Sequence, residues 1–146
     1  MIHLYTIGFT KKPAETFFTL LKNSGVDRLI DTRINNVSQL SGFAKGTDLK
    51  YFAGELANVS YEHNIDFAPT KELLLLYRTK KLTWPEYENE YLNLLDTRKI
   101  ARKLKIEKLH NNCLLCSEHK PDKCHRRLLA EYLQQVRNDI RITHLI

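Results

Sequence analysis

Cysteine, tryptophan and long apolar runs are all scarce in this sequence of 146 residues. The chain has three cysteines and one tryptophan. It has no run of about 18 apolar residues, which is the length that spans a bilayer. Its first residues, MIHLYTIGF, lack the basic and apolar regions of a secretion signal. We therefore expect no membrane segment, and we expect three free thiols in a reducing cytoplasm.

The length and charge set broad limits on the protein. A chain of this size fits one domain, residues 1–146, with a single core. It has 23 basic and 17 acidic residues, which gives a net charge of +6. A basic protein of this kind favours anionic partners such as nucleic acid, nucleotides or phosphate esters. Many soluble proteins that bind none of these carry a similar charge.

Short β-branched or apolar runs alternate with helical patterns along the chain. The five predicted strands cover residues 2–7, 28–33, 61–67, 113–117 and 140–146. Pro13 and Gly25 mark the two ends of the first helix. The later helices are expected to begin near Asp48, Thr70, Thr83 and Pro121, with a short helical stretch over residues 100–104.

This alternation predicts an α/β fold. We expect a single-domain three-layer structure with a mostly parallel sheet of about five strands and helices on both faces. In such sheets, ligands bind outside the carboxyl ends of the strands. Three polar clusters follow predicted strands, at Thr6–Gly8, Asp31–Arg33 and Cys116–Glu118. The sequence therefore predicts that they meet at one edge of the sheet.

The stretch CLLCSEHKPDKCHRR, residues 113–127, contains every cysteine of the chain. Cys113, Cys116, Cys124 and His125 are residue types that bind zinc. An offset of three on a strand, however, places Cys113 and Cys116 on opposite faces of the sheet. Chelation of one ion by the neighbours Cys124 and His125 is awkward. We therefore predict no metal and no cofactor, and we assign Cys113 to the core.

Cys116 and Cys124 are also candidate nucleophiles, because a strand end, a helix start and a nearby arginine all favour a thiolate. The order of strand, Cys116, loop and Arg126 is similar to the active-site loops of phosphatases and rhodaneses. The loop here is longer, has no glycine, and contains Glu118 and Asp122, which oppose binding of a phosphate dianion. A free cysteine that packs in the core is the alternative.

Glu118 is the preferred candidate for a general acid or base. Asp31 is its possible partner, since two carboxylates at one rim suit hydrolysis at a glycosidic centre. The alternatives are a solvated loop position for Glu118, and a cap or an ion pair with Arg33 or Arg126 for Asp31. Arg33, together with one of the neighbours Arg126 and Arg127, is predicted to offer forked donors to a phosphate or a carboxylate.

Amide side chains follow Arg33 directly. Asn35 and Asn36, with Ser38 and Gln39, suit contacts with base edges or sugar hydroxyls, and they are equally common in turns. Farther along, residues 99–108 form a basic stretch, which is either a solvated helix face or a surface for nucleic acid.

Four motifs together resemble the domain-of-unknown-function family 488. They are TIGFT at residues 6–10, Asp31-Thr32-Arg33, Cys116-Ser117-Glu118, and CHRR at residues 124–127. Residues 34–52 and 67–70 look like one of its subgroups. In this chain Phe9 stands where many members have histidine.

The resemblance implies a compact α/β domain with a polar site at these motifs, and it implies no substrate. The site candidates carried over from it are Cys116, Glu118, Cys124, His125, Arg126, Thr6, Gly8, Asp31 and Arg33.

Our leading hypothesis is an enzyme that acts on a nucleotide or a nucleic-acid-like anionic substrate. Glu118, Cys116 and Asp31 are its catalytic candidates, while the arginines, Asn35 and Asn36 bind the substrate. The alternatives are a nucleic-acid-binding module without catalysis, a cysteine-dependent transferase or phosphatase, and a purely architectural motif.

Overall fold

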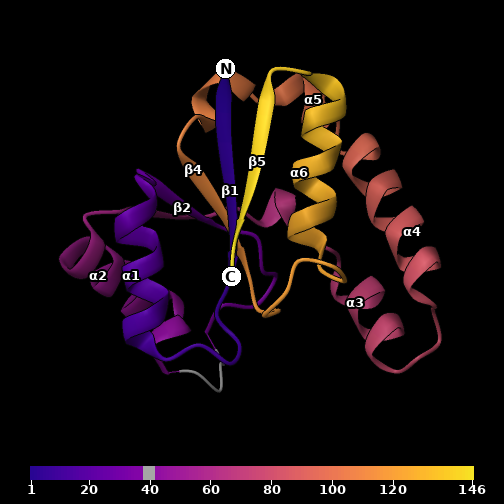
Figure 1. Cartoon of the computed structure of the whole chain (residues 1–146). Coiled ribbons are helices and arrows are strands. Elements are labelled where there is room, and N and C mark those ends of the chain that lie inside the picture. The colour runs from indigo at the N-terminus through magenta and orange to yellow at the C-terminus, as the bar shows by residue number, and fades with distance from the viewer. Residues whose placement is uncertain (38–41) are drawn as a thin grey trace.

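In a computed structural model, the chain folds into a five-stranded sheet with helices on both faces (Figure 1). The structure describes residues 1–37 and 42–146, so the predicted loop residues Ser38 and Gln39 lie outside it. The strands are β1 (Ile2–Gly8), β2 (Arg28–Asp31), β3 (Ser60–His63), β4 (Asn112–Cys116) and β5 (Ile140–Leu145). All pairs are parallel and the order is β3-β2-β4-β1-β5.

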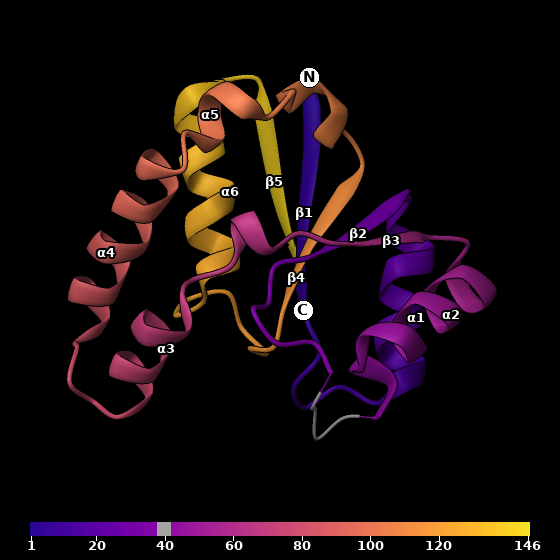
Figure 2. The ribbon, with the colours of Figure 1, turned by 180° about the vertical axis from the view of Figure 1, so that it is seen from behind.

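Within residues 1–37 and 42–146, six α-helices connect the strands. They are α1 (Ala14–Ser24), α2 (Gly46–Ala57), α3 (Lys71–Arg78), α4 (Trp84–Thr97), α5 (Ile100–Lys103) and α6 (His125–Val136). Helices α1 and α2 lie on one side of the sheet, and α3, α4 and α6 lie on the other, as Figures 1 and 2 both show. This is the predicted three-layer α/β fold. Among the described residues, no helix has the length and apolar character needed to cross a membrane.

The side chains of the central strands alternate between two hydrophobic clusters. On β4, Cys113 and Leu115 belong to the cluster beneath α1 and α2, while Leu114 belongs to the cluster beneath α4 and α6. This alternation follows from the two-residue period of a strand. It places Cys116 on the same side as Leu114, as the sequence predicts, and buries Cys113 in the core.

Local chemistry explains where several elements begin and end. Gly25 adopts the left-handed conformation (φ 82°) that ends α1. Thr70 caps α3, and Thr83 forms a capping box with Glu86 at the start of α4. These boundaries confirm the predicted ones.

Four predicted boundaries were wrong. Strand β2 ends at Asp31, because the Arg33 amide donates to the Asp31 carboxylate rather than to a neighbouring strand. Strand β3 ends at His63, because the Asn64 side chain accepts from the Asp66 amide and starts a 3₁₀ turn. Helix α2 begins at Gly46, so Asp48 lies in its first turn rather than at its cap. Helix α6 begins at His125, because residues 121–124 form a turn instead.

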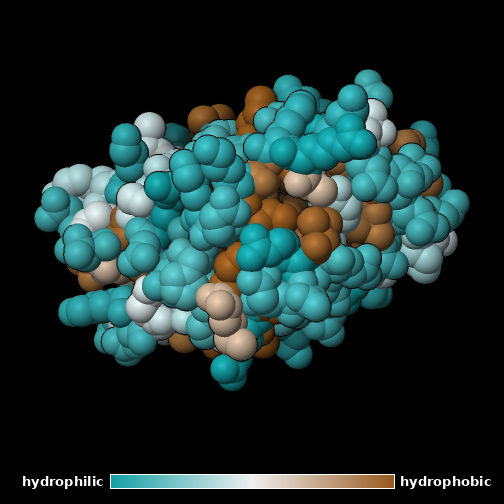
Figure 3. Space-filling view, turned by 90° about the horizontal axis from the view of Figure 1, so that it is seen from above, coloured by the Kyte–Doolittle hydropathy of each residue, from teal (hydrophilic) through white to brown (hydrophobic). Residues whose placement is uncertain are grey.

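The two ends of the sheet differ in character. Figure 3 views the end at which the strands begin, and it shows mostly hydrophilic residues around a smaller hydrophobic centre. The predicted basic stretch, residues 99–108, includes α5, which lies at this end in Figures 1 and 2. The carboxyl ends of the strands lie at the opposite end, where the candidate site is found.

Candidate functional site

A cavity of about 610 Å³ lies at the carboxyl ends of β2 and β4, bounded by α3 and by the first turns of α4 and α6. Its size is typical of a small-molecule site. The predicted site residues that line it are Arg33, Asn35, Cys116, Glu118, Cys124 and His125. Segments far apart in sequence therefore meet at one rim, as the parallel topology requires.

One wall of the cavity is aromatic. Tyr77 from α3 and Trp84 and Tyr87 from α4 line it, with ring centroids 4.9–5.6 Å apart. Leu74 and Leu75 extend the apolar surface along α3. Trp84 and Tyr87 are nearly parallel (23°), while Tyr77 meets them at 61° and 39°. Tyr87 is buried, so the half-buried rings of Trp84 and Tyr77 are the ones on which another ring can stack. None of the sequence motifs includes these residues.

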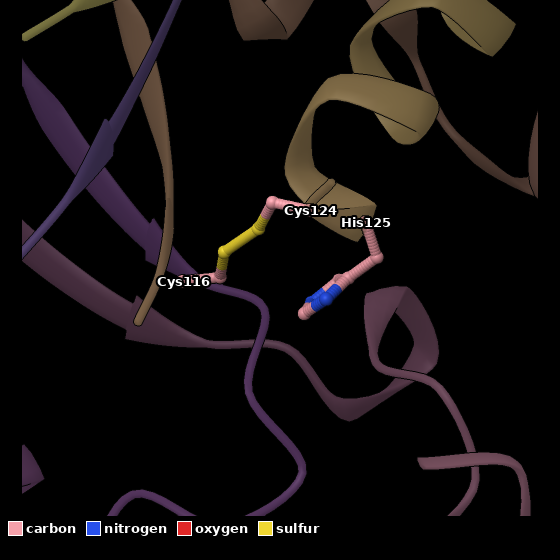
Figure 4. Close-up of side chains that lie close together, drawn as sticks. All are labelled: Cys116, Cys124 and His125. Carbon is pink, nitrogen blue, oxygen red and sulfur yellow. A yellow bond between two sulfur atoms is a disulfide. The ribbon is translucent and has the colours of Figure 1, made fainter. Parts of the chain in front are cut away.

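Two cysteines and one histidine form the floor of the cavity. Cys116 ends β4, Cys124 precedes α6, and His125 is the first residue of that helix (Figure 4). The two sulfurs form a disulfide, with 7.4 Å between the Cα atoms. The expectation of three free thiols is therefore corrected, because the turn before α6 folds Cys124 back onto the end of β4. Cys113 alone is free, and it is buried.

The side chains of the adjacent residues Cys124 and His125 lie close to each other and to Cys116. The potential ligand atoms of Cys116, Cys124 and His125 all lie within 4.8 Å of one another. These distances would allow one ion to contact all three residues, and the expectation that no metal binds here stays a prediction. Cys124 is extended (φ −139°) while His125 is helical, so the backbone changes direction between them.

His125 is held by the chain segment after β2. Its Nε2 lies 2.9 Å from both the carbonyl oxygen and the hydroxyl of Thr32. Because a carbonyl oxygen can only accept, Nε2 carries the hydrogen. Burial lowers the pKa of His125 to about 4, so the ring is neutral near pH 7.

The charges around the cavity are mostly positive. Lys71 and Arg78 on α3 and Lys123 before α6 line it and are exposed, as is Glu118. Glu118 is the only carboxylate among the residues described as lining the cavity. An anion that enters the cavity from solvent can therefore approach three exposed cations.

Asp31 does not act as a partner for Glu118. It is fully buried, and both of its oxygens accept hydrogen bonds from the Arg33 side chain, at 2.7 and 2.8 Å. The Tyr61 hydroxyl donates a further bond of 2.6 Å. Burial and then this bond raise the pKa of Tyr61. The hypothesis of two carboxylates at one rim is therefore wrong, and the alternative ion pair with Arg33 is observed.

Arg33 is oriented by Asp31 and by the carbonyl of Ala44. Its guanidinium carbon also lies 5.0 Å from the centre of the Phe9 ring. Its Nη1 is buried and has no hydrogen-bond partner among the described residues. Arg33 thus combines a fixed position at the cavity with a donor that the rest of the described chain does not use.

Arg126 does not reach the cavity as an anion-binding residue. It is fully buried, and its nitrogens contact the carbonyl oxygens of Glu118 and His119, the Cys116 sulfur and the Thr6 hydroxyl. Burial lowers its pKa to about 10. The prediction that it binds substrate is corrected, because it fixes the loop after β4 instead.

Thr6 and Gly8 support the same loop from β1. The Thr6 hydroxyl lies 2.6 Å from His144 Nδ1 and contacts Arg126, and it does not line the cavity. A Cβ at Gly8 would lie 1.5 Å from the carbonyl oxygen of Glu118. The glycine is therefore required for close packing of the loop against β1. Both residues lie behind the site rather than in contact with a ligand.

The two asparagines have separate places. Asn35 lines the cavity, and its Oδ1 accepts from the Val37 amide. Asn36 lies behind it, where its Nδ2 donates to the Tyr61 hydroxyl at 2.9 Å. The predicted substrate contact is therefore geometrically available to Asn35 only.

The aromatic residues and the exposed cations of the cavity belong to none of the sequence motifs. From the sequence alone, Tyr77 and Trp84 are predicted to be core or staple residues rather than stacking platforms, and Lys71, Arg78 and Lys123 belong to none of the four motifs. One signal was present in the sequence. The only tryptophan of the sequence follows a capping threonine, which places it in the first turn of a helix.

Comparison with known families gives one match. The domain of unknown function DUF488 matches residues 13–133, which is most of the chain. The chain therefore belongs to this family. No curated protein and no solved structure matches it.

Proposed function

We propose that this member of the DUF488 family is an enzyme that binds a nucleotide, or a nucleic-acid-like anionic ligand, in the cavity at the carboxyl ends of β2 and β4. The aromatic wall formed by Tyr77, Trp84 and Tyr87 carries this proposal. Nucleobases have flat π-faces, and stacking on aromatic side chains contributes about 1–3 kcal/mol per base.

The charge around the cavity supports an anionic ligand. Lys71, Arg78 and Lys123 stand at its mouth, where a phosphate would keep part of its hydration. Arg33 lies deeper, and its unpaired Nη1 suits a fixed acceptor on the ligand. A nucleotide would place its base against the aromatic wall and its phosphate near Lys71, Arg78 and Lys123, within the same cavity.

Glu118 is the proposed acid or base. It is exposed to the cavity, and its position is fixed through its backbone carbonyl, which accepts from Arg126. The side chain is therefore free to exchange protons with a ligand while the loop that carries it stays in place. Because Asp31 forms an ion pair with Arg33, Glu118 would act as the acid or base without a second carboxylate.

The first experiment uses the single tryptophan as the reporter. Trp84 fluorescence would be measured while nucleoside monophosphates, nucleosides, inorganic phosphate and a short single strand of nucleic acid are added in turn. We expect nucleotides to quench the signal at lower concentrations than nucleosides, and phosphate alone to have little effect. No response to any of the base-containing compounds would disprove the proposal.

The second experiment separates binding from catalysis. For the nucleotides that bind, product formation would be followed with the wild type and with Glu118→Gln. We expect the substitution to preserve binding and to lower turnover by about 10²–10⁴-fold. Asp122→Asn is the matched control, because Asp122 is an exposed carboxylate in the same loop that does not line the cavity. Equal turnover by the wild type and Glu118→Gln would remove Glu118 from the reaction.

A nucleic-acid-binding module without catalysis remains an outcome of the same test. The basic stretch over residues 99–108 lies at the other end of the sheet. Binding through that stretch would fall with salt and leave Trp84 fluorescence unchanged.

A further inference from the structure

The most concentrated chemistry in the structure is the group of Cys116, Cys124 and His125. All three are buried, and one potential ligand atom from each lies within 4.8 Å of the other two. In a tetrahedral zinc site with Zn–S of about 2.3 Å and Zn–N of about 2.0 Å, ligand atoms lie roughly 3.5–3.8 Å apart. The bonded sulfurs of Cys116 and Cys124 would have to be reduced and move apart to reach that spacing, and His125 already lies within 4.8 Å of both.

The imidazole of His125 is already arranged as a metal ligand. Its Nε2–H donates to the carbonyl oxygen of Thr32, which is the outer hydrogen bond that ligating histidines commonly make. That bond fixes the ring and leaves the lone pair of Nδ1 for a cation. Thr32 is itself anchored, because its hydroxyl donates to the Leu115 carbonyl at 2.7 Å.

An independent observation concerns the charge of Arg126. This guanidinium is fully buried, and no carboxylate among the described residues forms an ion pair with it. A buried charge is costly unless an opposite charge compensates it. Its Nη1 lies 3.4 Å from the Cys116 sulfur, so a thiolate at Cys116 would supply that opposite charge. Arg126 is therefore placed to donate a charge-assisted hydrogen bond to an anionic sulfur at Cys116, including a sulfur bound to Zn²⁺.

We propose that Cys116, Cys124 and His125 form a zinc site in the reduced protein, with its fourth position open to the cavity. The bonded sulfurs represent its oxidised form. Two molecules of a thiol reductant, RSH, cleave the bond by supplying two electrons and two protons. The products are two cysteine thiols and one RSSR disulfide. Zn²⁺ then replaces the two thiol protons, which pass to solvent.

Three protein ligands and one open position are the arrangement of catalytic rather than structural zinc sites. The three ligands and Glu118 line the same cavity. A water or a ligand atom on the zinc would therefore face the exposed carboxylate. The metal site does not rest on the proposed nucleotide binding, because its ligands belong to the floor of the cavity and not to the aromatic wall.

The experiment measures metal retention by the full chain. The protein would be reduced with an excess of thiol, stripped with a chelator, loaded with Zn²⁺ or Co²⁺, and freed from loose metal by gel filtration. We expect one metal per chain, and for cobalt we expect the thiolate-to-metal charge-transfer absorption of a bound sulfur. The oxidised protein should retain none.

Variants identify the ligands. Cys116→Ser, Cys124→Ser and His125→Gln should each weaken metal binding at least tenfold, with circular dichroism used to show that they fold. Cys113→Ala is the matched control, because this buried cysteine lies on the opposite side of β4. It should bind metal as the wild type does. The proposal is overturned if the reduced wild type retains no metal, or if Cys116→Ser retains as much as the wild type.

A Trp84 titration of the reduced, metal-free protein separates the two proposals. If nucleotides quench its fluorescence although no metal binds, only the zinc site is wrong. If metal binds and no base-containing compound changes the fluorescence, only the ligand proposal is wrong.

Discussion

The two faces of the sheet use aromatic residues in opposite ways. Beneath α1 and α2, Phe17, Phe18 and Phe43 form a cluster with ring centroids 5.0–5.5 Å apart. On the other face, the rings of Tyr77, Trp84 and Tyr87 come equally close but border a cavity. Phenylalanine has no polar tip to satisfy, whereas tyrosine and tryptophan keep one group in contact with polar partners. One face is therefore a closed core, and the other offers a surface to a ligand.

The largest expected effect is on the closed face. Phe17→Ala removes a fully buried ring, so we expect the free energy of unfolding to fall by about 3–5 kcal/mol. Denaturant unfolding measures this change. Phe17→Leu, which conserves most of the volume, should lose less than about 1.5 kcal/mol. If Phe17→Ala also removed ligand binding from the molecules that remain folded, the two faces would not be independent.

A smaller effect is expected where β1 supports the open face. Gly8→Ala places a methyl group against the Glu118 carbonyl, so the loop after β4 must shift. We expect a loss of about 1–3 kcal/mol of unfolding free energy, together with weaker ligand binding.

Gly54→Ala is the control for this glycine. Gly54 lies in α2, and a Cβ there would meet nothing within 4 Å. That substitution should leave stability equal or slightly higher. Equal stability of Gly8→Ala and Gly54→Ala would show that the loop is not packed against β1 in solution.

On the open face, we expect binding to change more than stability. Trp84→Ala removes a partly exposed ring of the aromatic wall. Nucleotide affinity measured by calorimetry should fall by about 1–3 kcal/mol if a base stacks there. Trp84→Phe keeps a ring and should retain most of the affinity. An unchanged affinity in Trp84→Ala would place the base elsewhere.

The smallest expected effect belongs to the exposed cations. Lys71→Gln and Arg78→Gln each remove one charge from the cavity mouth. For a single strand of nucleic acid, each should weaken binding and reduce the slope of log affinity against log salt by about 0.7. Lys103→Gln, on α5 at the other end of the sheet, is the control and should leave that slope unchanged. The reverse result would assign binding to the basic stretch over residues 99–108.

The fold could be predicted because its signals are local. The run at residues 2–7, the αL glycine at 25 and the capping threonines at 70 and 83 each act on their own neighbours. Parallel pairing then brought Gly8, Asp31 and Cys116 to one rim, since it depends only on the order of elements.

The site was only partly predictable, because its details depend on tertiary contacts. Two arginines that are both predicted from the sequence to bind substrate have different roles. Arg33 is paired with Asp31 beside the cavity, while Arg126 is buried behind it, and nothing in their local sequence separates these outcomes. The contact between Cys116 and Cys124 depends on the turn that precedes α6, and the aromatic wall depends on how α3 packs against α4.

The contact between Gly8 and the loop has a consequence for how this family can vary. A Cβ at position 8 would also lie 2.7 Å from Nη1 of Arg126. The guanidinium of Arg126, a residue 118 positions later, thus lies in the space that a side chain at position 8 would need. A side chain at position 8 would have to displace both the Glu118 backbone and this guanidinium, so a chain that keeps Arg126 and this loop in place needs glycine at position 8.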